Sequence, residues 1–446
     1  MPYPPPSRRD PVARAATGAV GGPTGRHARV GARGPGAVAA TLVALGAGML
    51  ALAVFQKGHC VVRGWANPDQ FWRTCYSDVP VLHVTTPLAD RVMPYLGEGI
   101  AQPPGSGLVM WLLALLTPRA GTEVAAQQWV FGLWALAAVV LLAAAVVAAV
   151  ALRPRNPWQA AHLALAPLLV PLALVSTTLL AVALAMLGLL AFRHARPAVA
   201  GGLLGGAVLT DPVALVLLAA VALVAVRAGR RWSAAVLAAA ALGVVALVTV
   251  VLTVLEPAGG TLWLRRAWSD DAGYGALALV PALWGADLPS WTLTAVELLG
   301  WVLALLVGGR LALSAATVPP LARVAAPMLL LVLLTSRELP VQASLWVLPL
   351  LALSAISWRD HLLWAGAEAV HFVTVWLHIG FASDPGRGLA GEDYAAAVVL
   401  RAVALAWVLV QAMRTAAPSG QGRTSSLPVV APDSRSAWAR EASASG

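Results

Sequence analysis

Long apolar runs separated by short polar gaps occupy the chain from residue 37 to residue 414. An α-helix needs about 20 apolar residues to cross a bilayer. Runs close to this length or longer lie at 37–55, 124–152, 232–255 and 361–381. A helix satisfies its own backbone hydrogen bonds inside a bilayer, so the pattern predicts an all-α, polytopic transmembrane protein rather than strands.

The remaining apolar runs are shorter and predict helices that fold back on one another. We interpret 158–192 and 197–226 as two short spans each, broken at Ser176–Thr177 and at Asp211–Pro212. Proline removes a backbone donor and disfavours helix in the residue before it, which favours the second break. The run 105–116 is too short to cross, so we expect an interfacial or re-entrant helix there.

Further spans are expected at 291–307, 321–334, 341–356 and 394–413. The total is roughly twelve spans, with both termini on the cytoplasmic side. The ends of the chain, 1–36 and 415–446, are rich in Pro, Gly, Ser and Arg and predict disordered cytoplasmic tails. The sequence therefore predicts three parts, namely the two tails and a membrane domain at 37–414.

Composition and charge support this interpretation and give it an orientation. Charged residues make up 11% of the chain, against about 25% in soluble proteins. The net charge is +10, and the arginines fall in the short gaps between apolar runs rather than on one soluble face. That distribution follows the positive-inside rule and argues against nucleic-acid binding. We therefore expect a protein of the cell (plasma) membrane, with a large first extracytoplasmic loop at 57–104.

Cysteine usage agrees with that orientation. The chain has two cysteines, Cys60 and Cys75, and both fall in the first loop. A pair that closes a short loop outside the cytosol suits a disulfide, with two unpaired thiols as the alternative. Zinc-ligand spacing is absent, and His59 and His83 are isolated, so no metal site is expected.

Three arginines, Arg265, Arg266 and Arg337, fall on the expected external side, where basic residues should be sparse. One explanation is snorkelling, in which the stem lies on apolar surface and the charged head stays in water. The other is contact with a lipid phosphate, whose oxygens match the planar arginine fork. Both explanations remain open at this stage.

Several short blocks of residues carry a family resemblance between about Gln56 and Arg414. They are Cys60-x3-Gly64-Trp65-x2-Pro68-x-Gln70-Phe71-x3-Cys75-Tyr76-Ser77-Asp78-x-Pro80, Met93-Pro94-Tyr95, Gly107-x2-Met110-Trp111, and Thr335-Ser336-Arg337 with Pro340-x-Gln342. In this order they resemble actinobacterial integral membrane proteins of glycosyltransferase family 87. That family has the GT-C fold, and its relatives include polyprenyl-phosphate-mannose-dependent mannosyltransferases.

The resemblance implies a membrane glycosyltransferase that acts on the external face. Its donor would be a polyprenyl-phosphate sugar, its acceptor a lipid or cell-envelope glycan, and it would need no cofactor. Asp78 matches the catalytic carboxylate, which takes the proton of the attacking hydroxyl as a general base. Arg337 aligns with a family lysine that would contact the donor phosphate, and Arg265 and Arg266 are further candidates. Substrate contacts are expected from Tyr76, Tyr95, Trp65 and Gln342.

Other interpretations stay open. Asp78 could instead cap a helix that begins at Val79–Pro80, as Asp211 could before Pro212. The stretch Ala101–Pro104 lacks the family's Glu-Tyr-Pro, and no lysine follows Thr210. A catalytically silent relative that binds or organises lipid and envelope components is therefore the alternative function. A secondary transporter is a more distant one, because few ionisable residues fall within the expected spans.

Overall fold

A computed structural model describes residues 11, 12, 15, 34–96, 100–119, 121–267 and 271–416. Every regular element in these ranges is an α- or 3-10 helix, and they contain no strand. The all-helical prediction is confirmed for this part of the chain. Most of the two expected tails lies outside the described residues, so their disorder stays a prediction.

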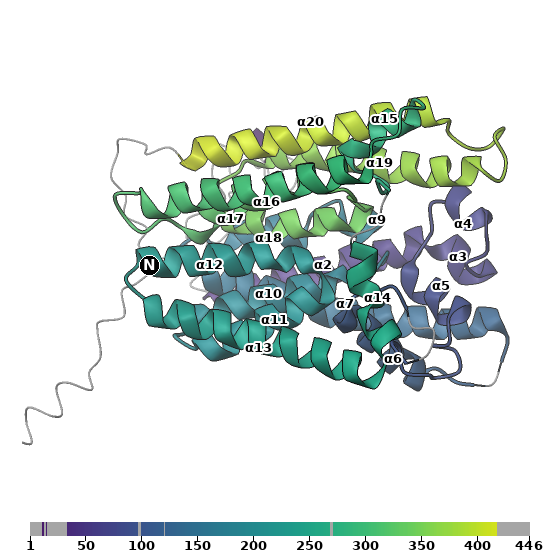
Figure 1. Ribbon diagram of the computed structural model, residues 1–446, viewed down its shortest axis with the longest axis horizontal. Helices are drawn as coiled ribbons and strands as arrows, with labels where there is room; N and C mark the ends of the chain where they lie inside the picture. Colours follow the sequence, from purple (N-terminus) through teal and green to yellow (C-terminus); the bar gives the residue numbers. More distant parts are fainter. Residues whose placement is uncertain are drawn as a thin grey trace, which may run out of the picture.

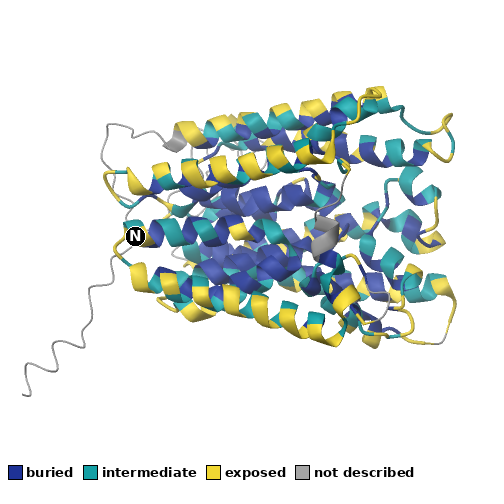
Figure 2. Ribbon diagram, viewed as in Figure 1, coloured by how far each residue is buried: buried dark blue, intermediate teal, exposed yellow. Residues whose placement is uncertain are grey.

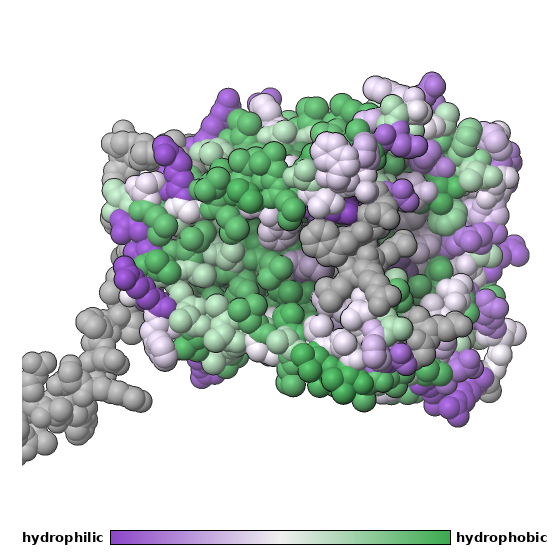
Figure 3. Space-filling view, in the orientation of Figure 1, coloured by the Kyte–Doolittle hydropathy of each residue, from purple (hydrophilic) through white to green (hydrophobic). Residues whose placement is uncertain are grey.

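Six helices are long and apolar enough to cross a membrane, as judged over the described residues. They are α2 (Pro35–Gln56), α7 (Glu123–Leu152), α13 (Arg231–Leu255), α16 (Ser290–Leu313), α19 (Trp358–Phe381) and α20 (Gly391–Ala416). These helices run along the long axis of the molecule (Figure 1). Apolar side chains cover the middle of the visible face, and polar ones gather towards its two ends (Figure 3). This is the surface expected of a polytopic membrane protein.

Shorter apolar helices fill the space between the long ones. They are α10 (Thr178–Arg193), α11 (Pro197–Thr210), α12 (Leu215–Arg227), α17 (Leu321–Thr335) and α18 (Val347–Leu353), with the 3-10 helices η2 (Pro212–Ala214) before α12 and η4 (Val341–Trp346) before α18. Many of their residues are buried, whereas α13 and α16 expose one face along their length (Figure 2). The break expected at Asp211–Pro212 is present between α11 and η2.

The stretch before α10 differs from the prediction of one short span. It consists of η1 (Pro157–Ala160), α8 (Ala161–Ala164) and α9 (Leu169–Leu172), joined by turns. Pro167 explains the break between α8 and α9, because it lacks a backbone N–H and restricts the residue before it. The turn expected at Ser176–Thr177 is nevertheless where this stretch ends and α10 begins.

Arginine side chains bind backbone carbonyl groups at one end of the bundle. Arg193 Nη1 donates to Ala151 O and Leu152 O at 2.7 and 2.8 Å, at the last turn of α7. Arg227 Nε donates to Ala315 O at 3.1 Å, just after α16. Cations here satisfy carbonyl groups that have no partner within their own helix. We call this the arginine end.

The opposite end carries the first loop, and we call it the cysteine end. It contains α3 (Gly58–Arg63), α4 (Asp69–Trp72), α5 (Asp78–Thr85), α6 (Pro104–Leu116), α14 (Pro257–Ala267), η3 (Leu277–Leu279) and α15 (Val280–Leu283) (Figure 1). Ser106, near the start of α6, donates to Thr210 O at 3.0 Å, and Arg91 donates to Thr117 O at 2.7 Å just after its end. The two ends of α6 thus contact the end of α11 and the first loop, and whether this helix crosses a membrane stays a prediction.

Candidate functional site

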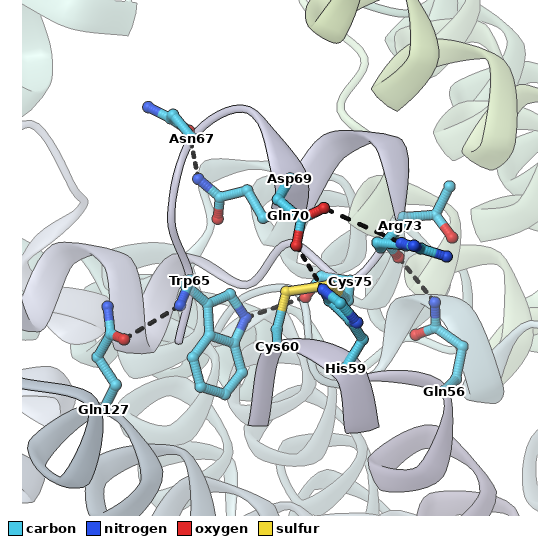
Figure 4. The surroundings of a disulfide bond; sticks show 11 residues. Gln56, His59, Cys60, Trp65, Asn67, Asp69, Gln70, Arg73, Cys75 and Gln127 are labelled. Carbon is cyan, nitrogen blue, oxygen red and sulfur yellow. Dashed lines mark hydrogen bonds and ion pairs between the residues drawn. A yellow bond between two sulfur atoms is a disulfide. The ribbon is translucent and has the colours of Figure 1, made fainter. Parts of the chain in front are cut away.

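A disulfide ties the first loop together. The sulfur atoms of Cys60 on α3 and Cys75 are bonded, and their Cα atoms lie 5.9 Å apart. The indole N–H of Trp65 donates to Cys75 O at 2.9 Å, and its backbone N–H donates to Gln127 Oε1 of α7 at 3.1 Å (Figure 4). The loop is therefore closed on itself and attached to a long helix of the bundle.

Asp78 stands at the start of α5, directly after this closed loop. Its backbone N–H donates to Val175 O at 2.7 Å, and the Ser77 hydroxyl donates to Leu174 O at 2.7 Å. Ser77, not Asp78, is the cap residue of α5, and no side chain makes a capping hydrogen bond there. The capping interpretation of Asp78 is thus wrong for this helix, and its carboxylate is left for other partners.

Two charges and one hydroxyl act on the half-buried Asp78 carboxylate. Burial raises the pKa of Asp78 to about 6. The Tyr76 hydroxyl opposes this rise by donating a hydrogen bond to the carboxylate, and Lys57 opposes it by its charge, whereas Glu338 adds to it. The carboxylate therefore changes its protonation close to neutral pH, as a general base at that pH requires.

Lys57 is the residue that ends α2, and its side chain is fully buried. Nζ lies 5.1 Å from the ring centroid of Phe372 on α19, a cation–π arrangement. Among the described residues the amine has no hydrogen-bond partner. Burial lowers the pKa of Lys57 to about 7, and the negative charge of Asp78 opposes the fall.

An aromatic cluster of Phe71, Tyr76 and Trp376 holds Tyr76 in place. The Tyr76 ring centroid lies 4.7 Å from that of Trp376 on α19 and 5.6 Å from that of Phe71 on α4. Phe71 and Trp376 stack on each other at 5.9 Å. This packing fixes the ring whose hydroxyl contacts Asp78, and it joins the first loop to α19.

The three arginines predicted to contact phosphate lie on different segments. Arg337 is buried, with Nε 2.5 Å from Glu297 Oε2 and Nη2 3.0 Å from Thr294 Oγ1, so its guanidinium faces α16. Arg265 and Arg266 belong to α14, but their side chains lie outside what the structure describes. The cysteine end therefore contains all three, and Arg337 already has a carboxylate partner.

Trp65 and Tyr95, both expected to contact substrate, are buried within the first loop. Trp65 is 5% exposed and packs on Phe131 of α7, and Tyr95 is fully buried. The Tyr95 hydroxyl lies 2.8 Å from Pro103 O, and its ring packs so closely on Gly107 that a side chain there would overlap it. In this structure both side chains are buried in the packing of the first loop, and their contact with substrate stays a prediction.

Two further candidate residues are Gln342 and Asp211. Gln342 is half-buried on η4. Asp211 caps η2 as expected, with Oδ1 3.2 Å from Val213 N, and its Oδ2 accepts the indole N–H of Trp346 at 2.7 Å. Within the described ranges no group of three or more His, Cys, Asp or Glu side chains could hold a metal ion.

Sequence reasoning missed Lys57, Glu338 and Trp376, which surround the Tyr76–Asp78 pair. One signal in the sequence did point to Lys57: it is the only lysine among the 30 basic residues of the chain. Glu338 and Trp376 carry no comparable signal, because only the fold brings α19 and the segment before η4 to the first loop.

Comparison of the chain with protein-family models, with curated proteins and with solved structures finds no significant match in any of the three.

Proposed function

We propose that this protein is a membrane glycosyltransferase that moves a sugar from a polyprenyl-phosphate donor to a lipid or cell-envelope glycan acceptor. The observation that carries the proposal is the Asp78 carboxylate, which is anchored at the start of α5, hydrogen-bonded by Tyr76 and raised in pKa to about 6. The family resemblance of the first loop supports mannose as the sugar. The apolar middle of the face in Figure 3 supports a protein that works in a membrane.

The same proposal includes a topology. The arginine end would face the cytoplasm of a cell whose plasma membrane holds the protein, since basic residues collect on that side. The cysteine end would then face outwards, where a disulfide is stable. The shorter apolar helices would complete roughly twelve crossings in a GT-C-like arrangement.

In the proposed reaction the acceptor hydroxyl attacks the anomeric carbon of the donor sugar. A bond forms between the acceptor oxygen and that carbon, while the bond from that carbon to the phosphate oxygen breaks. Asp78 accepts the hydroxyl proton, and the polyprenyl phosphate leaves with the electron pair. A base with a pKa near the working pH is ionised yet still basic enough to accept the proton.

The leaving phosphate gains negative charge and needs cations nearby. Arg265 and Arg266 on α14 are the proposed contacts, with Arg337 as a third. The pairing of Arg337 with Glu297 favours the second candidate function, a catalytically silent relative that binds lipid, because that arginine is already neutralised. In either function the ligand would be a polyprenyl-linked or related membrane lipid.

The test compares wild type with Asp78→Asn and with Asp90→Asn, an exposed carboxylate of the same loop that serves as the matched control. Membranes with each protein receive radiolabelled polyprenyl-phosphate-mannose and lipid or glycan acceptors. Asp78→Asn should lower transfer by about 100-fold or more, and Asp90→Asn should transfer as wild type does. Equal transfer by wild type and Asp78→Asn would remove Asp78 as the base. No transfer by wild type with several donors would favour the silent relative.

A further inference from the structure

The arginine end carries positive charge that its own helices do not offset. Between residues 124 and 255 the chain has seven arginines and one acidic residue, Asp211, which follows α11 at the cysteine end. Three of these arginines donate to backbone carbonyl groups of the bundle, namely Arg153, Arg193 and Arg227. These three hold helix ends together, and the charge of the others needs a different explanation.

Helices α11 and α13 begin next to each other at the arginine end. A Cβ atom at Gly201 of α11 would lie 2.3 Å from Leu237 O of α13, and one at Gly205 would lie 2.8 Å from Ala241 O. The two pairs keep the same offset in residue number, so the helices run side by side in the same direction. One helical turn earlier, this offset brings the first residues of α11 beside those of α13.

Three arginines surround these two helix starts, and we call them the arginine cluster. Arg196 directly precedes α11, and Arg230 and Arg231 lie at the start of α13. Arg196 and Arg231 are exposed, and the Arg230 guanidinium lies over the Phe192 ring of α10, 4.9 Å from its centroid. In the described part of the chain no ion pair joins the cluster to a carboxylate. Cations gathered in this way repel one another unless an anion offsets them.

We propose that the arginine cluster binds the phosphate of an anionic phospholipid headgroup. A planar guanidinium matches phosphate oxygens with paired hydrogen bonds. Trp232, the next residue of α13, is 80% exposed, and a tryptophan at the end of an apolar span typically lies at headgroup level. Basic clusters beside a span are typical of sites for anionic lipids.

The surface beside the cluster favours a lipid over a free phosphate ion. Helix α13 exposes apolar side chains along its length, among them Leu242, Leu247 and Val250. Acyl chains of a lipid can lie against this face while the headgroup contacts the arginines. The inference concerns the membrane-embedded chain and does not depend on sugar transfer.

Native mass spectrometry of the full chain in detergent measures lipid binding directly. The protein is titrated with phosphatidylglycerol and, separately, with phosphatidylcholine of the same acyl chains. Each arginine near a membrane surface strengthens anionic-lipid binding about five-fold, so Arg196→Gln/Arg231→Gln should bind phosphatidylglycerol about 30-fold more weakly than wild type. The matched control is Arg310→Gln/Arg359→Gln, which removes the same charge from exposed positions at the arginine end of α16 and α19. It should bind as wild type does.

Equal affinities of the two double variants would overturn the cluster as a site and leave a general attraction of the arginine end for anionic lipid. Equal affinities of wild type for the two lipids would overturn a role of headgroup charge. Displacement of phosphatidylglycerol by inorganic phosphate would make the cluster a site for a free ion and would overturn the lipid. Arg196→Lys/Arg231→Lys keeps the charge and should retain most of the binding. Loss of binding in that variant, with an unchanged melting temperature, would contradict recognition by charge.

Discussion

Arg401 of α20 and Glu368 of α19 form a fully buried ion pair, with Nε 2.9 Å from Oε2. The same guanidinium donates to the carbonyl oxygens of Leu339 and Pro340 and, at 3.0 Å, to the Ser344 hydroxyl. One side chain thus joins two long helices to η4 and to the segment between α17 and η4. That segment carries Glu338, one of the charges that act on Asp78.

Arg401→Met should therefore destabilise the protein strongly, because it leaves Glu368 charged and buried. Breaking a buried pair by removing one partner costs about 3–5 kcal/mol. The measurement is thermal unfolding of the full chain in detergent, followed by intrinsic tryptophan fluorescence. The double variant Arg401→Met/Glu368→Gln should unfold at a higher temperature than the single one. A double variant no more stable than Arg401→Met would show that the carboxylate is not the source of the loss.

The disulfide of the first loop supports a second prediction. Cys60 and Cys75 are 15 residues apart, and a cross-link over that distance stabilises by about 3 kcal/mol in the chain-entropy model. Cys75→Ser and reduced wild type should therefore melt at a similar, lower temperature than oxidised wild type. A maleimide–polyethylene glycol reagent should modify the unfolded chain only after reduction. Modification without reduction would mean that the two thiols are unpaired in the protein.

Apolar run lengths were enough to predict the class of fold and most helix positions, because the bilayer imposes length and composition on every span. The break at Asp211–Pro212 and the shortness of α6 followed from the same rules. The interrupted stretch from η1 to α9 did not, since its apolar composition hid the effect of Pro167. Run length counts apolar residues and does not register a missing backbone donor.

The candidate site was predictable only in part. Asp78, Tyr76 and the two cysteines lie close together in sequence, so a local motif could locate them. Lys57 precedes the motif, whereas Glu338 and Trp376 lie hundreds of residues beyond it, and contacts among distant helices decide that they meet. Trp65 and Tyr95 show the converse: both belong to the motif, yet both side chains are buried in packing.

A close approach of α16 and α17 leads to a third prediction. A Cβ atom at Gly300 of α16 would overlap the side chain of Thr335 at the end of α17, whereas one at Gly309 of the same helix would meet nothing within 4 Å. Alanine favours a helix over glycine by about 0.5–1 kcal/mol. Gly309→Ala should therefore hold or raise the melting temperature, and Gly300→Ala should lower it by several degrees. Two variants with the same midpoint would contradict the close packing of these helices.

Lys57 contributes to the way stability depends on pH. Its pKa is about 7 in the folded chain and near 10.5 when unperturbed. Between these values the unfolded chain binds more protons, so this residue makes the folded state more stable as pH rises. Below pH 7 Lys57 is protonated in both the folded and the unfolded chain, so it destabilises the folded state by the full amount.

Lys57→Met should accordingly be more stable than wild type at pH 6, and the difference should shrink as the pH rises towards 10. Melting temperatures of both proteins across this range measure the effect. Arg63→Met, which removes an exposed cation from α3, is the control and should follow wild type at every pH. Asp78→Asn should increase the penalty instead, because it removes the charge that favours the ammonium. A constant difference between Lys57→Met and wild type from pH 6 to 10 would mean that the pKa of Lys57 is the same in the folded and the unfolded chain.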